Sequence, residues 1–348
     1  MIEIVGGGLA AAKLVESYRE AGGGEPIVVH SQDDRPPYHR PPLSKALLRG
    51  EAEPENALVH DADWYAQHDA ELRLGDAVAS LDDLRGDTIV LATGARPRPL
   101  GDALMLRTLD DALALRAAAE RAETATVVGG GFIGCEVAAS LTVRGLRVTQ
   151  IVREPGVFWT LAAPPLSEVL AERYRERGID LRLEASEIPD ADLVVAGVGV
   201  QPNVELAQEA GLEVRSGVVV DERFRTARDG VYAIGDVAEF YDPIFRRHRR
   251  IEHWSNANYH GGRLGKLLAG EDAPYDTVSS FFSEQFGKVF KLFGDITGHE
   301  RLDVDGDFAE KAVGRYRIQG RTVAAVLVGL SEDEENALKE EIRAGAAG

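Results

Sequence analysis

The sequence has one cysteine and no long apolar run. Because Cys135 is the only cysteine among 348 residues, one chain can build neither a disulfide framework nor a redox-active cysteine pair. No stretch approaches the roughly 20 apolar residues of a membrane helix, and the first residues lack the basic segment of a secretion signal. These absences exclude dithiol reductases and favour a cytoplasmic protein.

Basic residues are scarce relative to acidic ones. Lys and Arg number 39 against 58 Asp and Glu, which gives a formal net charge of -19. Phosphate contacts need clustered Lys and Arg, so this balance argues against a nucleic-acid partner. The 8 histidines show no ligand spacing typical of zinc or iron, and no metal site is predicted. The length and the 44% of hydrophobic residues predict two or three domains.

A strand, turn, helix and strand pattern opens the chain. Residues 1–5 are short and apolar, a glycine triplet at residues 6–8 breaks the run, and residues 9–19 form an Ala-rich amphipathic segment. A second apolar run at residues 27–29 completes a βαβ unit with parallel strands. This unit predicts a nucleotide-binding domain.

The glycine turn of this unit has the G-x-G-x-x-A pattern of a dinucleotide fingerprint. Gly6 permits the tight turn, Gly8 lets backbone amides approach a pyrophosphate, and Ala11 allows close packing of helix on strand. Leu9 and Ala10 begin the helix, whose N-terminus carries partial positive charge. An ordinary glycine turn between a strand and a helix is the competing interpretation.

The same order of elements returns in the middle of the chain. Residues 125–128 form an apolar run, a helix is predicted from residue 132 to about 144, and residues 147–152 supply the next strand. The turn between the first two carries a complete G-x-G-x-x-G fingerprint, made by Gly129, Gly131 and Gly134. Two different dinucleotides are therefore expected.

The rest of the chain shows two patterns of hydrophobic residues. Further buried strands are predicted at residues 88–92, 193–196 and 218–220. An amphipathic helix is predicted at residues 109–121, and from about residue 273 the pattern alternates as in an antiparallel sheet. The alternating runs are residues 289–293, 314–318 and 323–328. A charged helix at residues 332–343 follows.

A Gly-Asp turn far downstream indicates which fingerprint binds which dinucleotide. Gly235 and Asp236 follow an apolar run, and Asp236 could accept hydrogen bonds from the ribityl hydroxyls of a flavin. Together with Ala92, Thr93 and Gly94 after another strand, this turn assigns FAD to the first fingerprint. The competing interpretation is that Asp236 caps a following helix.

The segment Pro-Tyr-His-Arg-Pro-Pro-Leu-Ser-Lys at residues 37–45 is the most specific motif of the chain. It resembles the flavin-contacting segment of the pyridine-nucleotide flavin reductases that serve oxygenase ferredoxins and rubredoxins. Apoptosis-inducing factor is a more distant look-alike. The resemblance covers nearly the whole chain and implies an α/β fold, with two Rossmann-like dinucleotide-binding domains of the glutathione-reductase type and a small α+β C-terminal domain.

The resemblance also implies domain boundaries. The expected FAD-binding domain is discontinuous and consists of residues 1–103 and 216–272. The NAD(P)H-binding domain would be residues 104–215. Residues 273–348 would form the C-terminal domain.

Three residues receive catalytic roles from the resemblance. In that family the lysine of the flavin segment approaches the reactive end of the isoalloxazine and pairs with a glutamate after the second fingerprint, which implies these roles for Lys45 and Glu136. A cation there favours the reduced ring, and pairing limits its burial cost. Trp254 looks like the family tryptophan beside the ring, on the exit path of electrons. An ordinary surface Lys, a helix Glu and a core Trp are the competing interpretations.

The candidate cofactor residues fall into two sets. The candidate FAD-binding residues are Gly6, Gly8, Leu9, Ala10, Asp33, Arg40, Pro41, Ser44, Lys45, Ala92, Thr93, Gly94, Gly235, Asp236, Glu252, His253 and Trp254. The candidate NAD(P)H-binding residues are Gly129, Gly131, Phe132, Ile133, Gly134, Glu136, Arg153, Glu154, Gly197, Val198 and Gly199. Cys135 lies at the start of the helix of the second fingerprint and is interpreted as structural, because no second thiol exists.

The chain departs from the usual pattern at the strand ends that bind ribose. Val152 stands at the usual acidic position of the second nucleotide domain, while Arg153 could accept a phosphate and Glu154 could reach the ribose hydroxyls. This favours NADH and leaves NADPH open. In the first domain the nearest carboxylate is Asp33, which we assign to the adenosine ribose of FAD.

Two connecting segments are short. Compared with the family, residues 72–89 and 181–193 are too few to hold the β-hairpins usually found there. Shorter loops lower the entropy cost of closure but remove surface that could contact a partner. Partner identity is therefore less transferable than flavin binding.

The leading hypothesis is an electron-transfer reductase. NADH would deliver a hydride to FAD, which would pass single electrons to an iron-sulfur protein such as a ferredoxin or rubredoxin of an oxygenase system. A basic run could dock this acidic partner through Arg246, Arg247, Arg249 and Arg250. A solvated loop on an antiparallel hairpin is the competing interpretation of that run.

Two other functions fit the same residues. One is an NADH oxidase or quinone reductase that needs no protein partner. The other is a redox-sensing flavoprotein in the manner of apoptosis-inducing factor. The sequence names neither the electron acceptor nor the oligomeric state, and a homodimer stays open.

Overall fold

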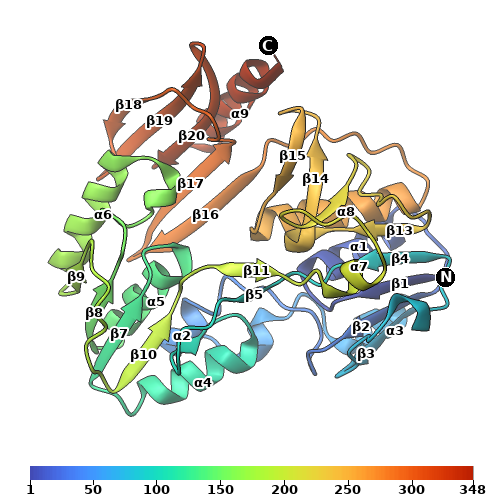
Figure 1. Cartoon of the computed structure of the whole chain (residues 1–348), viewed down its shortest axis with the longest axis horizontal. Coiled ribbons are helices and arrows are strands. Elements are labelled where there is room, and N and C mark those ends of the chain that lie inside the picture. The colour runs from blue at the N-terminus through green and yellow to red at the C-terminus, as the bar shows by residue number, and fades with distance from the viewer. Residues whose placement is uncertain (348) are drawn as a thin grey trace. The chain divides into compact units, whose positions relative to one another are not determined.

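The computed structural model describes residues 1–347, and the chain divides into two compact units (Figure 1). Unit 1 comprises Met1–His39, Ala57–Arg96 and Gln201–Thr277. Unit 2 comprises Arg40–Asn56, Pro97–Val200 and the described residues from Val278 onward. These units are defined by packing, so the expected division into three domains by function stays a prediction.

Unit 1 is built on a parallel sheet in the order β13-β4-β1-β2-β3. Its strands are β1 (Ile2–Val5), β2 (Ile27–Ser31), β3 (Ala70–Leu74), β4 (Thr88–Leu91) and β13 (Val231–Ala233). The strands β1 and β2 are buried along their whole length, including the polar residues Glu3 and His30, which lie 3.4 Å apart. The helix α1 (Leu9–Glu20) connects them.

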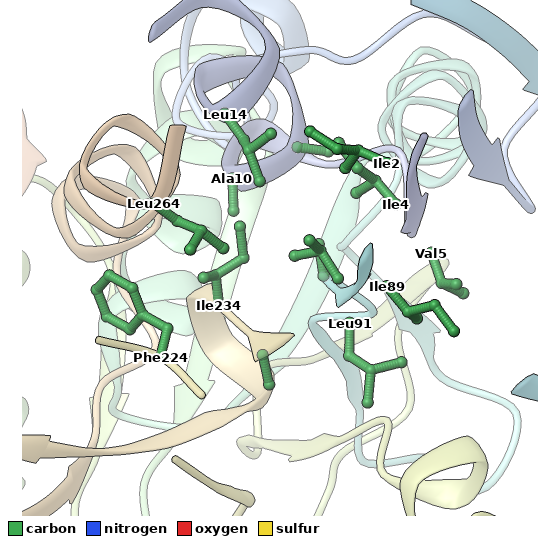
Figure 2. Packing of buried hydrophobic residues seen from close by; sticks show 14 of the residues in the cluster. Ile2, Ile4, Val5, Ala10, Leu14, Ile89, Leu91, Phe224, Ile234 and Leu264 are labelled. Atoms are coloured by element: carbon green, nitrogen blue, oxygen red, sulfur yellow. The ribbon is translucent and has the colours of Figure 1, made fainter. Parts of the chain in front are cut away.

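The helix α8 (Trp254–Leu268) packs closely on α1 because it carries glycine at the contact. A Cβ added at Gly261 would collide with the carbonyl oxygen of Ala10. Figure 2 shows Leu14 of α1, Leu264 of α8 and Ile234 at the end of β13 in one apolar core. Burial of these side chains stabilises unit 1 by about 1.5–3 kcal/mol each.

Smaller elements complete unit 1. They are α3 (Ala62–Gln67), α7 (Glu205–Glu209), β12 (Val218–Val220), β14 (Ala238–Asp242) and β15 (Arg247–Arg250). The last three form a sheet in which β14 and β15 are an antiparallel hairpin. Two of the five passages of the chain between the units fall within the paired strands β5 (Ala95–Pro97) and β11 (Val200–Pro202).

Unit 2 contains a second parallel sheet, in the order β6-β10-β7-β8-β9. Its strands are β6 (Leu104–Met105), β7 (Thr124–Val128), β8 (Arg147–Ile151), β9 (Asp180–Arg182) and β10 (Leu193–Ala196). Its helices are α2 (Ala46–Arg49), α4 (Leu109–Ala119), α5 (Phe132–Val143) and α6 (Pro164–Glu176). The start of α4 is fixed by a capping box between Thr108 and Asp111.

The C-terminal part of unit 2 is an antiparallel sheet in the order β16-β17-β20-β19-β18. Its strands are β16 (Ser280–Gln285), β17 (Lys288–Gly294), β18 (Arg301–Asp307), β19 (Lys311–Ile318) and β20 (Arg321–Val328). The helix α9 (Glu332–Ala347) packs on β20 and β17, where Lys291 lies 2.6 Å from Glu335. The central strand β20 is buried from its second residue to its last.

The predicted fold class is confirmed, with differences at element ends. The strand at residues 218–220 exists, but it belongs to the three-stranded sheet of unit 1 and not to a Rossmann-like sheet. The shortness of both connecting segments is also confirmed. Residues 75–87, all described, contain only a 3-10 turn at Leu81–Asp83, and residues 183–192, likewise described, contain no strand. Among the described residues, no helix has the length and hydropathy needed to cross a bilayer.

Candidate functional site

The first glycine fingerprint lies in unit 1, between β1 and α1. Gly6 has a φ of 113°, and a Cβ added there would collide with the carbonyl oxygen of Ala92. Gly8 is the N-cap of α1 with φ -92° and ψ -174°, and no side chain caps the helix. The amides that begin with Leu9 and Ala10 are therefore left for an anion, which fits a pyrophosphate.

The second fingerprint lies in unit 2, between β7 and α5. Gly129 has a φ of 121°, and Gly134 is packed against the carbonyl oxygen of Gly129 so closely that a Cβ would collide with it. A Cβ added at Gly131, the N-cap of α5, would meet only open space. An uncapped helix N-terminus with room at its second glycine is what a dinucleotide pyrophosphate requires.

The other predicted NAD(P)H residues lie around this turn. Phe132 packs against the ring of Phe281 at 4.6 Å between centroids. Ile133 and Val198 are 40% and 36% exposed, which is high for large apolar side chains and suits the rim of a ligand site. Gly199 has a φ of 96°, so the turn after β10 needs glycine there.

Asp33 lies two residues beyond β2 and is already engaged by its own loop. Its Oδ2 accepts a hydrogen bond of 2.7 Å from the Tyr38 hydroxyl, and its Oδ1 accepts one of 3.1 Å from the backbone amide of Arg35. A carboxylate has about four acceptor sites. Asp33 therefore keeps the capacity to accept a ribose hydroxyl while its own position is fixed.

The corresponding strand end of unit 2 is organised differently. Val152, at the usual acidic position, is fully buried. A side chain there cannot contact a ribose, so this position does not need a carboxylate. Arg153 and Glu154 are both exposed. The backbone carbonyl of Glu154 accepts from the amide of Glu184 at 3.2 Å, which ties this loop to the end of β9.

The Gly-Asp turn of unit 1 follows β13. Gly235 has a φ of 73°, and its amide donates a hydrogen bond of 3.2 Å to Nδ1 of His260 in α8. Asp236 lies inside a 3-10 turn, Gly235–Val237, whose N-cap is Ile234. The interpretation of Asp236 as a helix cap is therefore wrong, because no α-helix starts there.

His260 is a residue that the sequence analysis missed. It is fully buried, its ring lies 4.5 Å from that of Phe224 and 4.6 Å from that of Phe240, and burial lowers its pKa to about 3. Since Nδ1 accepts the Gly235 amide, the neutral ring carries its proton on Nε2. The i, i+4, i+8 spacing of Asn256, His260 and Leu264, all buried, was the available signal for this inward position.

Ala92, Thr93 and Gly94 follow β4 and are clamped by Asn203, a second missed residue. The Thr93 hydroxyl donates to the Asn203 carbonyl at 2.7 Å, and the Asn203 side-chain amide donates to the Thr93 carbonyl at 2.8 Å. The Asn203 backbone amide bonds the Gly94 carbonyl at 3.0 Å. These reciprocal bonds fix the turn after β4, although Asn203 is 110 positions from Thr93 in the sequence.

Trp254 begins α8 and is 37% exposed, so its interpretation as a core residue is wrong. Its indole Nε1 donates a hydrogen bond of 3.0 Å to Nδ1 of His39. Burial lowers the pKa of His253, the N-cap of α8, to about 4. Glu252 forms an ion pair with Arg250. Residues 252–254 are thus held by Arg250 through Glu252 and by His39 through Trp254, all within unit 1.

Lys45 and Glu136 form an ion pair in unit 2, with 2.6 Å between Nζ and Oε2. Their side chains are only 12% and 5% exposed, so neither is an ordinary surface charge. Lys45 also donates to the carbonyl of Pro41 at 3.3 Å. The Arg40 guanidinium donates to the carbonyl of Arg107 at 3.2 Å, which anchors the start of this segment.

Three hydroxyl and amide groups complete the surroundings of this pair. Ser44 donates to Glu136 Oε2 at 2.5 Å, and Ser283 of β16 donates to Oε1 at 2.6 Å. Gln285 in turn donates to the Ser283 hydroxyl at 2.6 Å. Ser283 and Gln285 were not predicted from the sequence, because the pattern of an antiparallel strand does not tell which helix the strand will face.

Two of the four arginines that we expected to form a basic patch are turned inward. Arg249 forms an ion pair of 2.8 Å with the fully buried Asp242 and lies over the ring of Phe245 at 4.6 Å. Arg250 is 18% exposed and pairs with Glu252. Arg249 and Arg250 therefore belong to the structure of the β14–β15 hairpin, because their charges are neutralised there. Arg246 is exposed.

Cys135 is 1% exposed, and burial raises the pKa of its thiol to about 12. A thiol in this state is not a nucleophile at neutral pH. Among the described residues, no group of His, Cys, Asp and Glu is arranged to hold a metal ion.

The model of the pyridine nucleotide-disulphide oxidoreductase family matches residues 2–188 and 187–261. The chain therefore belongs to this family. Putidaredoxin reductase of Pseudomonas putida is 32% identical over 369 aligned positions, which cover 93% of this chain and 87% of that protein. The ferredoxin–NAD(+) reductase component of the anthranilate 1,2-dioxygenase system of Burkholderia cepacia is 35% identical over 386 positions, covering 99% and 94%.

A solved structure extends this similarity to the whole architecture. The crystal structure of the covalent putidaredoxin reductase–putidaredoxin complex superposes with a TM-score of 0.92 and 31% identity, covering 99% of this chain and 93% of that one. The resemblance inferred from the flavin segment is confirmed. The 386 aligned positions exceed the 348 residues of this chain, so the relative carries insertions, in accord with the two short segments.

Proposed function

We propose that this chain is an FAD-dependent NAD(P)H:ferredoxin-type reductase. A hydride would pass from NADH to FAD, and single electrons would then pass to an iron-sulfur acceptor, a ferredoxin or rubredoxin, of an oxygenase system. The observation that carries the proposal is the presence of two glycine turns, each before a helix without a side-chain cap, in a chain whose relatives are named ferredoxin–NAD(+) and putidaredoxin reductases.

Each glycine turn receives one dinucleotide in this proposal. FAD would be held by the Gly6–Gly8 turn, Asp33, Thr93 and Asp236, and NADH by the turn at Gly129, Gly131 and Gly134 with Glu154 at the ribose. Residues 1–103 with 216–272 and residues 104–215 are the corresponding domains. When bound, the flavin accepts two electrons as a hydride and releases them one at a time.

Lys45 and Glu136 are the residues of this chain that we assign to the redox step. A lysine charge near the reactive end of the flavin favours the electron-rich reduced ring, and the buried Glu136 carboxylate pairs with that lysine at 2.6 Å. A cysteine route is not part of the proposal, since Cys135 is buried and its thiol pKa is raised to about 12. Trp254, exposed and hydrogen-bonded to His39, is assigned to the exit of electrons.

The docking proposal is narrower than the whole basic run. Arg246 is exposed and Arg247 is half-buried, and we assign the attraction of an acidic ferredoxin to these two arginines. Reversing both charges, as in Arg246→Glu with Arg247→Glu, should lower ferredoxin-dependent turnover and its salt sensitivity without slowing flavin reduction. Equal slowing of both half-reactions would contradict this surface. A cytoplasmic location is part of the same proposal.

An anaerobic stopped-flow experiment tests the function. The purified protein is mixed with NADH or NADPH while the visible spectrum is recorded, and the reduced protein is then mixed with a two-iron ferredoxin. We expect a flavin spectrum that bleaches with NADH and returns with ferredoxin. A protein that binds no flavin would contradict the proposal, and a flavin that is reduced by NADH but not reoxidised by ferredoxin would leave an oxidase or a redox sensor.

A further inference from the structure

The Glu136 carboxylate is held by donors from two directions. Its Oε2 lies 2.6 Å from Lys45 Nζ and 2.5 Å from the Ser44 hydroxyl, both from the segment before α2. Its Oε1 accepts from Ser283 at 2.6 Å, and Ser283 belongs to β16. Ser283 is thus the donor that fixes the second oxygen from an independent element of unit 2.

The hydroxyl of Ser283 has its direction fixed by a further residue. Ser283 and Gln285 lie two residues apart on β16 and therefore face the same side of the strand, where they are 0% and 1% exposed. The Gln285 amide donates to the Ser283 oxygen at 2.6 Å. A hydroxyl has one proton, and because its oxygen accepts from Gln285, that proton is directed to Glu136.

We propose that Ser283 is a positioning residue of the reductase, which keeps the Glu136 carboxylate in the orientation that pairs with Lys45, and that Gln285 orients the Ser283 hydroxyl. This inference rests on the proposed function. Without Ser283, the terminal torsion of Glu136 has a broad energy well and the carboxylate can turn Oε2 away from Lys45. The buried Oε1 would also lose its donor.

The test uses the full chain loaded with FAD. Ser283→Ala should lower the limiting rate of flavin reduction by NADH about tenfold, the consequence expected from losing roughly one hydrogen bond to a charged group. The NADH concentration at half-maximal rate should change less than about twofold, because the glycine turn of the nucleotide site is untouched. The flavin midpoint potential should become more negative, since the lysine charge is less well held.

Two variants separate the positioning role from a general effect of an altered core. Ser283→Thr retains the hydroxyl and should restore most of the limiting rate. Gln285→Leu removes the orienting amide and should slow reduction less than Ser283→Ala. The matched control is Ser167→Ala, which removes another buried hydroxyl of unit 2, one that donates to the Val157 carbonyl at 2.5 Å. This control should reduce its flavin at the wild-type rate.

The outcomes separate a failure of the proposed function from a failure of the positioning role of Ser283. If wild-type protein binds no flavin or is not reduced by NADH, the proposed function fails and this inference falls with it. If wild-type protein is reduced but Ser283→Ala keeps the same limiting rate and midpoint potential, the positioning role alone is wrong. Equal slowing by Ser167→Ala would also overturn it, because the effect would then be one of core packing.

Discussion

The two glycine fingerprints of the chain solve the same packing problem with different residues. In unit 1 the third small residue is Ala11, fully buried, and Ala92 follows the neighbouring strand β4. In unit 2 the corresponding residues are Gly134 and Gly197, and a Cβ at Gly197 would lie 2.7 Å from the amide nitrogen of Gly134. Two methyl groups fit in unit 1 and none in unit 2. The tolerance for alanine therefore depends on how closely each turn is packed and not on the residue pattern alone.

The first helices of the two units are also supported differently. In unit 1, α8 lies on α1 through a glycine face, and a Cβ at Gly265 would be 2.6 Å from the carbonyl oxygen of Leu14. In unit 2 the partner of α5 includes β16 of the antiparallel sheet, through the rings of Phe132 and Phe281. A helix thus supports the first fingerprint, whereas a sheet supports the second.

The largest expected effect comes from exchanging the third small residues. Gly134→Ala should destabilise the protein by about 3 kcal/mol, because its Cβ has no space against the Gly129 carbonyl. Ala11→Gly, the reverse exchange in unit 1, should cost only about 1 kcal/mol, the difference in helix propensity. Urea denaturation followed by circular dichroism measures both. Equal effects would mean that the two turns pack alike.

A smaller effect is expected at the Gly-Asp turn of unit 1, where the Gly235 amide donates to His260. His260→Phe leaves this buried amide without its acceptor and should weaken FAD binding by about 2 kcal/mol. His260→Gln offers a carbonyl acceptor and should retain FAD. Titration of the apoprotein with FAD, followed by flavin fluorescence, measures this affinity. Unchanged affinity in His260→Phe would show that the turn does not need the histidine.

The same histidine predicts an acid dependence of unit 1. Burial lowers the pKa of His260 from 6.5 to about 3, so the unfolded chain binds a proton that the folded chain does not. The resulting stability is fully present above pH 6.5 and is lost as the pH falls toward 3. His260→Gln should flatten this part of the curve of unfolding free energy against pH. A wild-type slope in that variant would assign the acid dependence to other groups.

The smallest effect is expected at the strand ends. Glu154→Ala should lower the ratio of kcat/KM for NADH over NADPH about tenfold, because it removes a ribose acceptor and a charge that repels the 2′-phosphate. Arg153→Ala should raise the ratio, since it removes a phosphate partner. Steady-state kinetics with both nucleotides is the measurement. A ratio that does not respond to either change would place nucleotide selection elsewhere in unit 2.

Much of the fold could be predicted from the sequence because its signals are local. Apolar runs of strand length predicted β1, β7 and β10, and the glycines between strand and helix predicted turns that have the positive φ values of Gly6 and Gly129. The two short connecting segments could be seen by counting residues. Each of these inferences depends on neighbours within a few positions of the chain.

The partners of the charged residues could not be predicted. The basic run around Arg249 resembled an exposed patch, yet Asp242 neutralises Arg249 across a hairpin whose register the sequence does not specify. The resemblance supplied the pair of Lys45 and Glu136, but not Ser283, which is 147 residues from Glu136. Long-range pairing depends on which faces of which elements meet.

The sequence by itself determined the elements, the family and the two nucleotide-type turns, because backbone conformation and apolar periodicity are properties of short segments. The tertiary structure alone decided which polar groups are buried together. A buried carboxylate, arginine or imidazole must find its partner among whatever the packing brings within hydrogen-bonding distance. Asn203 at the Thr93 turn, His260 at Gly235 and Ser283 at Glu136 were therefore visible only in the folded chain.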